Sequence, residues 1–301
     1  MKELSERIEK LTKLINEAEY IIIGAGAGLS TAAGIDYGGE RFKKNFSDYI
    51  EKYDFTDMYS SGFYPFETEE EKWAYWARHI YLNSTGMEAT ELYKKLLKLV
   101  KDEKYFIITT NVDNQFIKAG FNRNNIFATQ GSYNLIQCKN ACHNKLYDAT
   151  DLVEKLRENT SVDLKVPTEL VPKCPICGGE MDVNLRKDHL FVEDDTWHKQ
   201  NKAYTDFINN AKNSKTVLLE FGIGFNTPGI IRFPFESMTT KIKEWNLARF
   251  NKDYLEIVVD YHGTGKLVSC DSLDSMKLQN DFQNRYIPFS EDIELILNQL
   301  I

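Results

Sequence analysis

The sequence lacks any hydrophobic run long enough to cross a membrane, and its longest apolar stretches are short segments such as YIII and TVLLEFGIGF. It also has no block of basic residues, and its formal net charge of -8 argues against binding to nucleic acid. The N-terminal segment MKELSERIEKLTKLINEAE alternates charged and aliphatic residues and has no signal-peptide core. We therefore expect a cytoplasmic protein whose partners are neither membranes nor nucleic acids.

Cysteine is scarce, with five among 301 residues, and four of these fall within one part of the chain. In the cytoplasm such cysteines are more often metal ligands or free thiols than disulfides. Cys138 and Cys142 form one pair, and Cys174 and Cys177 form a second pair in the turn CPICGG. Four thiolates predict a closed, structural zinc site, and unligated or disulfide-paired cysteines are the alternative. Cys270 stands alone and is expected to be an ordinary thiol.

Short apolar runs alternate with amphipathic helices along much of the chain. Strands are expected within the segments YIIIGAGAGLSTAAGI, KYFIITTN, NNIFAT, KTVLLEFGIGF and YLEIVVD. Helices are expected over residues 3–18 and within the segments EEEKWAYWARHIYL and ATELYKKLLKLV. This alternation predicts an α/β fold, a Rossmann-like parallel sheet with helices on both faces.

Two segments interrupt the alternation and are expected to form a smaller second domain. Residues 37–85 are rich in aromatic side chains and predict a helical insertion, with Trp73 and Trp76 in its core. Residues 136–186 contain the clustered cysteines and predict a zinc-ribbon module. The Rossmann-like domain would then comprise residues 1–36, 86–135 and 187–301.

The segment IIIGAGAGLSTAAGI has the pattern of a dinucleotide-binding loop. Gly24, Gly26 and Gly28 follow an apolar strand and open a helix, for which Ser30 and Thr31 are candidate caps. Such glycines let the backbone approach a pyrophosphate at the helix N-terminus. No acidic residue stands at the usual spacing after the next strand to bind a ribose, so an ordinary dehydrogenase is a poor fit.

Taken together, these motifs resemble the sirtuin family over most of the chain. GAGLSTAAGI is similar to the family's first nucleotide loop, and TTNVDN is similar to its Thr-Gln-Asn-x-Asp segment. TQGSYNLIQC is similar to its His-Gly-Ser segment, which runs into the first zinc cysteine. FGIGFNTP is similar to its later Gly-Thr-Ser loop.

Four departures from the family pattern change what the resemblance implies. The family's Pro-Asp-Phe-Arg is reduced to Asp36-Tyr37-Gly38, and Thr110 replaces a glutamine. LFVED at 190–194 stands where the family has Phe-Gly-Glu, and Gln130 replaces the catalytic histidine. This combination resembles the macrodomain-linked class M sirtuins of microbial pathogens, which are ADP-ribosyltransferases more than deacylases.

The resemblance implies NAD as co-substrate and assigns roles to three catalytic residues. Asp113 should bind the nicotinamide carboxamide, and Asn111 should orient the ribose and an ordered water. Gln130 should fix the ribose hydroxyls, because an amide cannot accept the proton that deacylation must remove. The implied cofactor-binding residues are Gly26, Ala27, Gly28, Ser30, Asp36, Tyr37, Thr110, Gly222, Gly224, Phe225, Asn226 and Asp260.

The resemblance favours a mono-ADP-ribosyltransferase that modifies a protein, with structural zinc as its metal. It implies a lipoylated carrier of the glycine-cleavage H type as the acceptor, and a macrodomain hydrolase as the opposing partner. A weak NAD-dependent deacylase is one alternative, and an NAD hydrolase or sensor without a protein acceptor is another. Asn111 and Asp113 could also simply end a strand and cap a turn, and Gln130 could mark an inactive enzyme.

Overall fold

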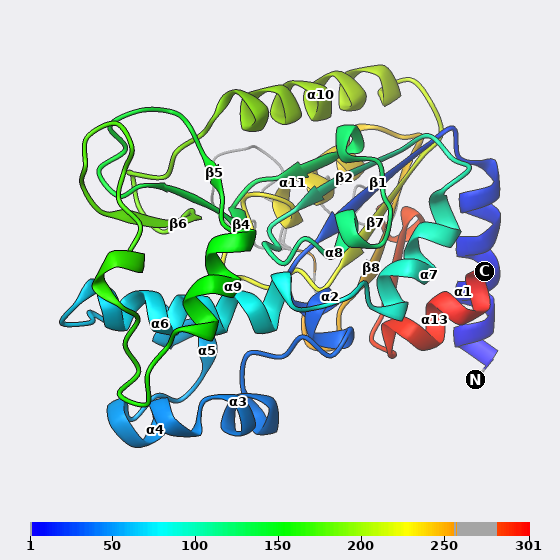
Figure 1. Ribbon diagram of the computed structural model, residues 1–301. Coiled ribbons are helices and arrows are strands. Elements are labelled where there is room, and N and C mark those ends of the chain that lie inside the picture. The colour runs from blue at the N-terminus through cyan, green and yellow to red at the C-terminus, as the bar shows by residue number, and fades with distance from the viewer. Residues whose placement is uncertain (1, 256, 258–281) are drawn as a thin grey trace, which may run out of the picture.

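The computed structural model describes residues 2–255, 257 and 282–301. Its centre is a six-stranded sheet of order β3-β2-β1-β7-β8-β9, in which all neighbouring strands are parallel (Figure 1). The strands are β1 (Tyr20–Ala25), β2 (Tyr105–Thr109), β3 (Ile126–Ala128), β7 (Thr216–Phe221), β8 (Trp245–Phe250) and β9 (Tyr286–Phe289). The predicted α/β fold with a Rossmann-like parallel sheet is therefore confirmed.

Helices cover both faces of this sheet. They are α1 (Lys2–Glu17), α2 (Ala27–Ala32), α7 (Glu91–Val100), α8 (Gln115–Lys118), α10 (Asp195–Ala211), α11 (Arg232–Lys241) and α13 (Ile293–Leu300). Ile21 and Ile23 of β1 pack in one buried cluster with α1, α7 and α13, whereas Ile22 packs in another with α10 and α11. Successive side chains of a strand point to opposite faces, so a continuous apolar run is what a sheet covered on both sides requires.

A second group of elements holds its own hydrophobic cluster beside the parallel sheet. Its helices are α3 (Gly39–Asn45), α4 (Ser47–Tyr53), α5 (Met58–Ser61), α6 (Glu69–Ile80), the π-helical turn Tyr81–Thr85 and α9 (Thr150–Glu158). Its strands are β4 (Gly131–Cys138), β5 (Tyr147–Asp148) and β6 (Met181–Leu185), which form an antiparallel sheet of order β5-β4-β6. Single 3₁₀ turns occur at Arg123–Asn125 and Thr168–Leu170. Trp73 and Trp76 lie in this cluster, as predicted from the aromatic helix.

The C-terminal part of the sheet differs from the sequence prediction. Residues 254, 255 and 257 of the expected strand YLEIVVD are not in a strand, and its remaining residues lie outside the described part of the chain. The strands β8 and β9 were not predicted. β8 contains Arg249, which is fully buried and pairs with Glu220 of β7 at 2.7 Å, so its apolar run is interrupted by an internal ion pair.

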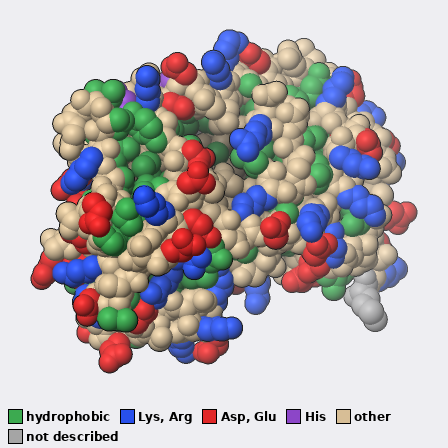
Figure 2. Space-filling model, viewed as in Figure 1, with side chains coloured by type: hydrophobic (Ala, Val, Ile, Leu, Met, Phe, Trp, Pro, Cys, Tyr) green, Lys and Arg blue, Asp and Glu red, His purple; other side chains and the backbone are tan. Residues whose placement is uncertain are grey.

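The exterior of the molecule carries charges of both signs. Acidic and basic side chains are interspersed over the face seen in Figure 2. Within the described residues, no helix is both long enough and apolar enough to span a bilayer. The N and C ends of the described chain lie close together beside α1 and α13 (Figure 1).

Candidate functional site

Two glycine loops, far apart in the sequence, meet at the carboxyl ends of β1 and β7. The Gly26 N–H donates to the Phe221 carbonyl, and the Gly28 N–H donates to the Gly222 carbonyl, both at 3.0 Å. A Cβ on Gly28 would lie 2.6 Å from the Gly222 Cα, and Gly222 itself has a φ of +61°. Both positions therefore require glycine, and the two predicted nucleotide loops form one continuous backbone surface.

The helix that follows the first loop is capped differently from the prediction. Gly26 is the N-cap residue, and no side chain caps the helix. Ser30 and Thr31 were expected as caps, but both lie inside α2, so that prediction is wrong. Because α2 begins right after the glycine turn, Ser30 faces inward and is buried.

The buried Ser30 side chain contacts Asp113, another predicted site residue. Its hydroxyl donates to Asp113 Oδ2 at 2.5 Å, and the Gln115 N–H donates to Asp113 Oδ1 at 3.0 Å. The Tyr93 hydroxyl lies 2.9 Å from Ser30 Oγ, and it donates there because the serine hydrogen is used by the carboxylate. Burial raises the pKa of Asp113, and the Ser30 hydrogen bond opposes this.

Asn111 joins the same cluster in a fixed orientation. Its Nδ2 donates to the Gly26 carbonyl at 2.9 Å and lies 3.0 Å from Ser30 Oγ and 3.2 Å from the Tyr93 hydroxyl. A backbone carbonyl can only accept, so the amide nitrogen must face Gly26. The carbonyl oxygen of Asn111 therefore faces away from the Gly26 carbonyl and can act as a hydrogen-bond acceptor.

Gln130 lies in the turn between β3 and β4. Thr109 of β2 pairs with Ala128 of β3, so the segments carrying Asn111 and Gln130 leave neighbouring strands at the same edge of the sheet. The Gln130 carbonyl accepts from the Arg186 N–H at 3.0 Å. Gly131 has a φ of +94°, and a Cβ there would lie 1.9 Å from the Asn184 carbonyl oxygen, so this turn tolerates no side chain at 131.

Thr110 and the loop after α2 lie around the same edge. The Thr110 N–H donates to the Ala25 carbonyl at 3.0 Å. Asp36 is exposed, its carbonyl accepts from Arg41 Nη1 at 2.8 Å, and the Tyr37 hydroxyl lies 2.7 Å from the Tyr133 hydroxyl. Arg41 was not predicted, and it anchors this loop from α3.

The second loop holds the remaining predicted cofactor residues. Asn251 donates to the Ile223 carbonyl at 2.8 Å, and Arg232 lies 4.3 Å from the centre of the Phe225 ring. Gly222, Gly224, Phe225 and Asn226 lie in the segment that follows β7, and Gly222 contacts the first loop through the Gly28 N–H. Asp260 lies outside the described residues.

The four predicted zinc ligands form one cluster. Their sulfur atoms all lie within 4.8 Å of one another, with Cys138 3.7 Å from Cys177 and Cys142 3.7 Å from Cys174. A tetrahedral zinc ion with Zn–S bonds of about 2.3 Å places its sulfurs about 3.8 Å apart, so these residues fit that ion. His143 Nδ1 lies 3.0 Å from Cys142 Sγ, next to the cluster.

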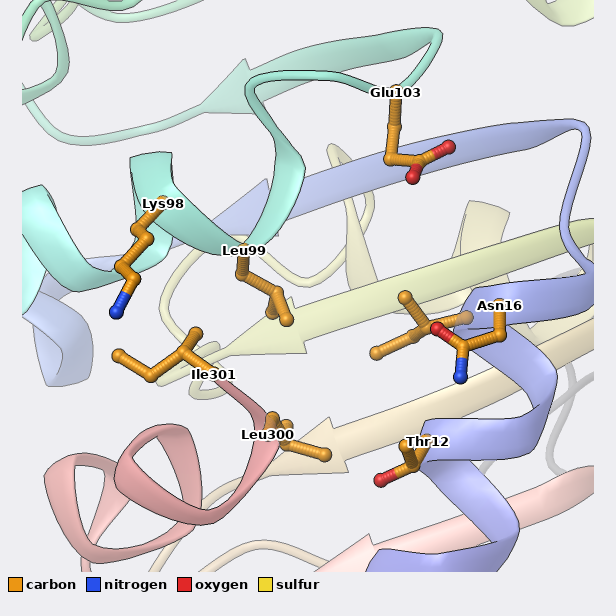
Figure 3. A pocket seen from close by; sticks show the side chains of 8 residues that line it. Thr12, Asn16, Lys98, Leu99, Glu103, Leu300 and Ile301 are labelled. Atoms are coloured by element: carbon orange, nitrogen blue, oxygen red, sulfur yellow. The ribbon is translucent and has the colours of Figure 1, made fainter.

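Some residues around the site were missed by sequence analysis. Tyr93, His79 and Tyr133 supply buried polar atoms, and nothing in their local sequence distinguishes them from ordinary core aromatics. A separate surface pocket of about 140 Å³ lies between α1, α7 and the end of α13 (Figure 3). It is lined by Thr12, Ile15, Asn16, Lys98, Leu99, Glu103, Leu300 and Ile301, and includes no predicted site residue.

Known proteins share this architecture and these motifs. The model of the Sir2 family matches residues 26–218. The chain is 36% identical over 298 residues to "Protein ADP-ribosyltransferase" of Staphylococcus aureus (strain Mu50), covering 99% of this chain and 88% of that protein. It is 30% identical over 237 residues to "Probable bifunctional ADP-ribose hydrolase/ADP-ribosyltransferase" of Fusarium oxysporum f. sp. cubense, covering 75% of this chain and 39% of that protein.

Solved structures give the same fold. The structure of Sir2Tm bound to a propionylated peptide superposes with a TM-score of 0.55 at 16% identity, covering 97% of this chain and 96% of that one. With its parallel sheet, paired glycine loops and four-cysteine cluster, the chain belongs to the Sir2 family. The predicted sirtuin resemblance is confirmed.

Proposed function

We propose that this protein is an NAD-dependent mono-ADP-ribosyltransferase that modifies a protein acceptor. The full-length relative at 36% identity, named a protein ADP-ribosyltransferase, supports this activity. In the reaction, the bond between the ribose C1′ and nicotinamide breaks, and a bond from C1′ to an acceptor atom forms. Nicotinamide leaves with the bonding electron pair, and the acceptor atom releases its proton to solvent or a base.

The contacts at the edge of the sheet support separate roles for Asp113, Asn111 and the glycine loops in breaking the bond between the ribose and nicotinamide. Asp113 accepts hydrogen bonds from the carboxamide of nicotinamide, and Ser30 keeps its carboxylate oriented. Asn111 presents its carbonyl oxygen to the ribose hydroxyls, because its amide nitrogen is bound to the Gly26 carbonyl. The paired glycine loops receive the pyrophosphate. Such positioning of a reactive bond is worth several orders of magnitude in rate.

Gln130 is the observation that favours transfer over deacylation. Deacylation needs a base to remove a proton from a ribose hydroxyl, and loss of a general base costs about two to four orders of magnitude. A glutamine amide holds hydroxyls but cannot take up that proton. His79 cannot replace it, because it is fully buried, and its burial lowers its pKa to about 3. Transfer to an outside nucleophile does not use this step.

The acceptor and the cellular setting follow from the family resemblance. A lipoylated carrier protein of the glycine-cleavage H type is the proposed acceptor. A macrodomain hydrolase is the proposed opposing partner, which the name of the bifunctional Fusarium relative supports. We place the reaction in the cytoplasm, which suits a zinc site built from four reduced cysteines.

The test combines the purified protein, NAD labelled in its adenylate half, and a lysate depleted of small molecules. Wild type is expected to label a protein band, and Asn111→Ala is expected to reduce labelling by about two orders of magnitude. Asn213→Ala, an exposed asparagine after α10, is the matched control and should label normally. If wild type labels no band, the transferase proposal is wrong, and nicotinamide release without a band identifies a hydrolase.

A second variant tests the role of Gln130. Gln130→His supplies the missing base, so it should gain removal of an acetyl group from a lysine peptide, with nicotinamide released alongside. If wild type already removes the acetyl group as fast as it labels protein, the deacylase alternative replaces the transferase.

A further inference from the structure

A chain of hydrogen bonds runs from Tyr37, in the loop after α2, into the aromatic core. The Tyr37 hydroxyl lies 2.7 Å from the Tyr133 hydroxyl, which lies 2.8 Å from His79 Nε2. His79 Nδ1 lies 3.1 Å from the Tyr75 hydroxyl, which donates to the Met58 carbonyl at 2.7 Å. Tyr75, His79 and Tyr133 are all buried.

The direction of every bond in this chain follows from its inner end. The Met58 carbonyl can only accept, so the single Tyr75 hydroxyl hydrogen is used there. The Tyr75 oxygen must then accept from His79, which places the imidazole hydrogen on Nδ1. A neutral imidazole has one N–H, so Nε2 accepts from Tyr133, and the Tyr133 oxygen accepts from Tyr37.

His79 stays neutral across the working pH range. It is enclosed by aromatic rings, including Trp76 at 5.0 Å and Tyr133 at 4.9 Å between ring centres. Burial, followed by the charge of Arg41, lowers its pKa to about 3. The imidazole of His79 therefore stays in the neutral tautomer with its hydrogen on Nδ1 and is not protonated on Nε2.

The consequence appears at the outer end of the chain. The only hydrogen of the Tyr37 hydroxyl is committed inward to Tyr133, so toward the site this oxygen can only accept. The Tyr133 N–H donates to the Val112 carbonyl at 3.0 Å, so the Tyr37 oxygen ends a chain that is attached beside Asp113, whose carboxylate is also an acceptor. A ligand bound between them must bring hydrogen-bond donors to both.

We propose that His79 is a positioning residue that, through Tyr133, holds the Tyr37 hydroxyl as an acceptor for the carboxamide of NAD. This inference rests on the proposed function. A primary amide has two N–H hydrogens, one for Asp113 and one for Tyr37. A carboxylate in place of the amide has none, so the pair also selects NAD over nicotinic acid adenine dinucleotide.

The test breaks the hydrogen-bond chain at Tyr133 and, in a second variant, at Tyr75. Calorimetry then compares the binding of NAD with that of nicotinic acid adenine dinucleotide. Tyr133→Phe frees the Tyr37 hydrogen directly. Tyr75→Phe removes the acceptor for His79 Nδ1, so the imidazole hydrogen can move to Nε2 and reverse the two outer bonds. Each variant should weaken NAD binding about three- to ten-fold, the worth of one hydrogen bond, and reduce the preference for NAD by a similar factor.

Tyr49→Phe is the matched control for these variants. Tyr49 lies in the same core with its ring 5.5 Å from Tyr75, and its buried hydroxyl has no hydrogen-bond partner among the described residues. It should lose a buried hydroxyl without changing either affinity. If Tyr75→Phe and Tyr133→Phe show the same dinucleotide preference as Tyr49→Phe, the inference is overturned.

A spectroscopic measurement tests the direction of the hydrogen bonds at His79 in the absence of NAD. In ¹⁵N NMR spectra, His79 of wild type should show a protonated Nδ1 and an unprotonated Nε2 from pH 5 to pH 9. A hydrogen on Nε2 in wild type would overturn the proposed bond order. If the NMR result is as expected but wild type does not bind NAD, the proposed function fails, and the assignment of Tyr37 to the carboxamide fails with it.

Discussion

The hydroxyl of Ser30 donates to Asp113 Oδ2 at 2.5 Å, which joins α2 to the segment after β2 across 83 positions of the sequence. The bond holds a buried carboxylate in a fixed orientation beside Asn111, whose Nδ2 lies 3.0 Å from the same Ser30 oxygen. Such a carboxylate is retained at a cost, because folding removes it from water. The cost in folding stability and the contribution of the carboxylate to NAD cleavage can be measured separately.

The first prediction concerns the pH dependence of stability. The folded pKa of Asp113 is raised above its ordinary value of 3.8, so folding disfavours its charged form. Its contribution to stability is complete below pH 3.8 and is lost as the pH rises through the folded pKa. Asp113→Asn, which cannot ionise, should therefore raise the urea midpoint at neutral pH, while NAD cleavage falls by about two orders of magnitude.

Unfolding curves from pH 3 to pH 8 supply the internal control for Asp113→Asn. The difference from wild type should close at the acidic end, where the wild-type carboxyl is also neutral. A variant that is less stable than wild type at pH 7 would mean that the hydrogen bonds from Ser30 and the Gln115 N–H stabilise the carboxylate by more than its burial costs.

The second prediction concerns the contact between the glycine loops. Gly28→Ala places a Cβ 2.6 Å from the Gly222 Cα, so one loop must shift away from the other. We expect a loss of about 1–3 kcal/mol in the free energy of unfolding and at least a ten-fold weaker affinity for NAD. Urea unfolding and calorimetry measure the two effects.

Gly229→Ala is the control for Gly28→Ala, because nothing lies within 4 Å of the Cβ it would add. It should match wild type in both measurements. Equal NAD affinity in all three proteins would show that the loop contact has no part in binding the dinucleotide.

The third prediction concerns the four-cysteine cluster. Cys174→Ser should remove bound zinc, and because Cys138 ends β4 while Gln130 precedes it, NAD cleavage should also fall by an order of magnitude or more. Metal analysis should find one zinc per wild-type chain. Cys270→Ser changes the fifth cysteine, which lies outside the described residues, and should keep its zinc. Full activity of zinc-free Cys174→Ser would contradict this coupling.

The fourth prediction concerns an amide pair that holds the segment after β6. Gln137 Oε1 accepts from the Val192 N–H at 3.0 Å and from Asn184 at 2.7 Å, while its Nε2 donates to the Leu190 carbonyl at 2.7 Å. Gln137→Met keeps the shape but removes these bonds. It should cost about 1–3 kcal/mol of stability and expose the Val192 amide to hydrogen exchange.

Hydrogen exchange followed by mass spectrometry measures the release of residues 188–194 in Gln137→Met. Gln299→Met, on the exposed side of α13, is the matched substitution and should leave that segment protected. If protection is unchanged in Gln137→Met, the segment is held by its packing alone.

Much of the sheet could be predicted because its strands have buried faces on both sides. β1 is a continuous apolar run, β7 holds the apolar residues Val217, Leu218 and Leu219 before Glu220, and the parallel arrangement alone brings the segments after β2 and β3 to one edge. β8 was missed because Arg249 and Asn246 break its apolar pattern, and the partners that satisfy Arg249 come from β7 and α11.

The candidate site likewise has residues that could be predicted from the sequence and residues that could not. Asn111, Asp113 and the glycine loops follow strands directly, so their gathering depends only on topology. The contacts of Tyr93 with Ser30 and of His79 with Tyr133 depend on helix packing across 63 and 54 positions. Neither helix carries a local pattern that distinguishes these polar groups from ordinary core aromatics.

The turn that contains Gln130 joins β3 of the parallel sheet to β4 of the three-stranded sheet, and this connection has a mechanical consequence. Strand β4 starts one residue after Gln130 and ends at Cys138, so one strand links the cofactor edge to the metal cluster. A rotation of the three-stranded sheet against the parallel sheet moves Gln130 relative to Asn111, which is fixed to the parallel sheet through Gly26. The distance between the Asn111 and Gln130 side chains therefore depends on the angle between the two sheets. A pair of spectroscopic labels, one on each sheet, would measure changes in that angle.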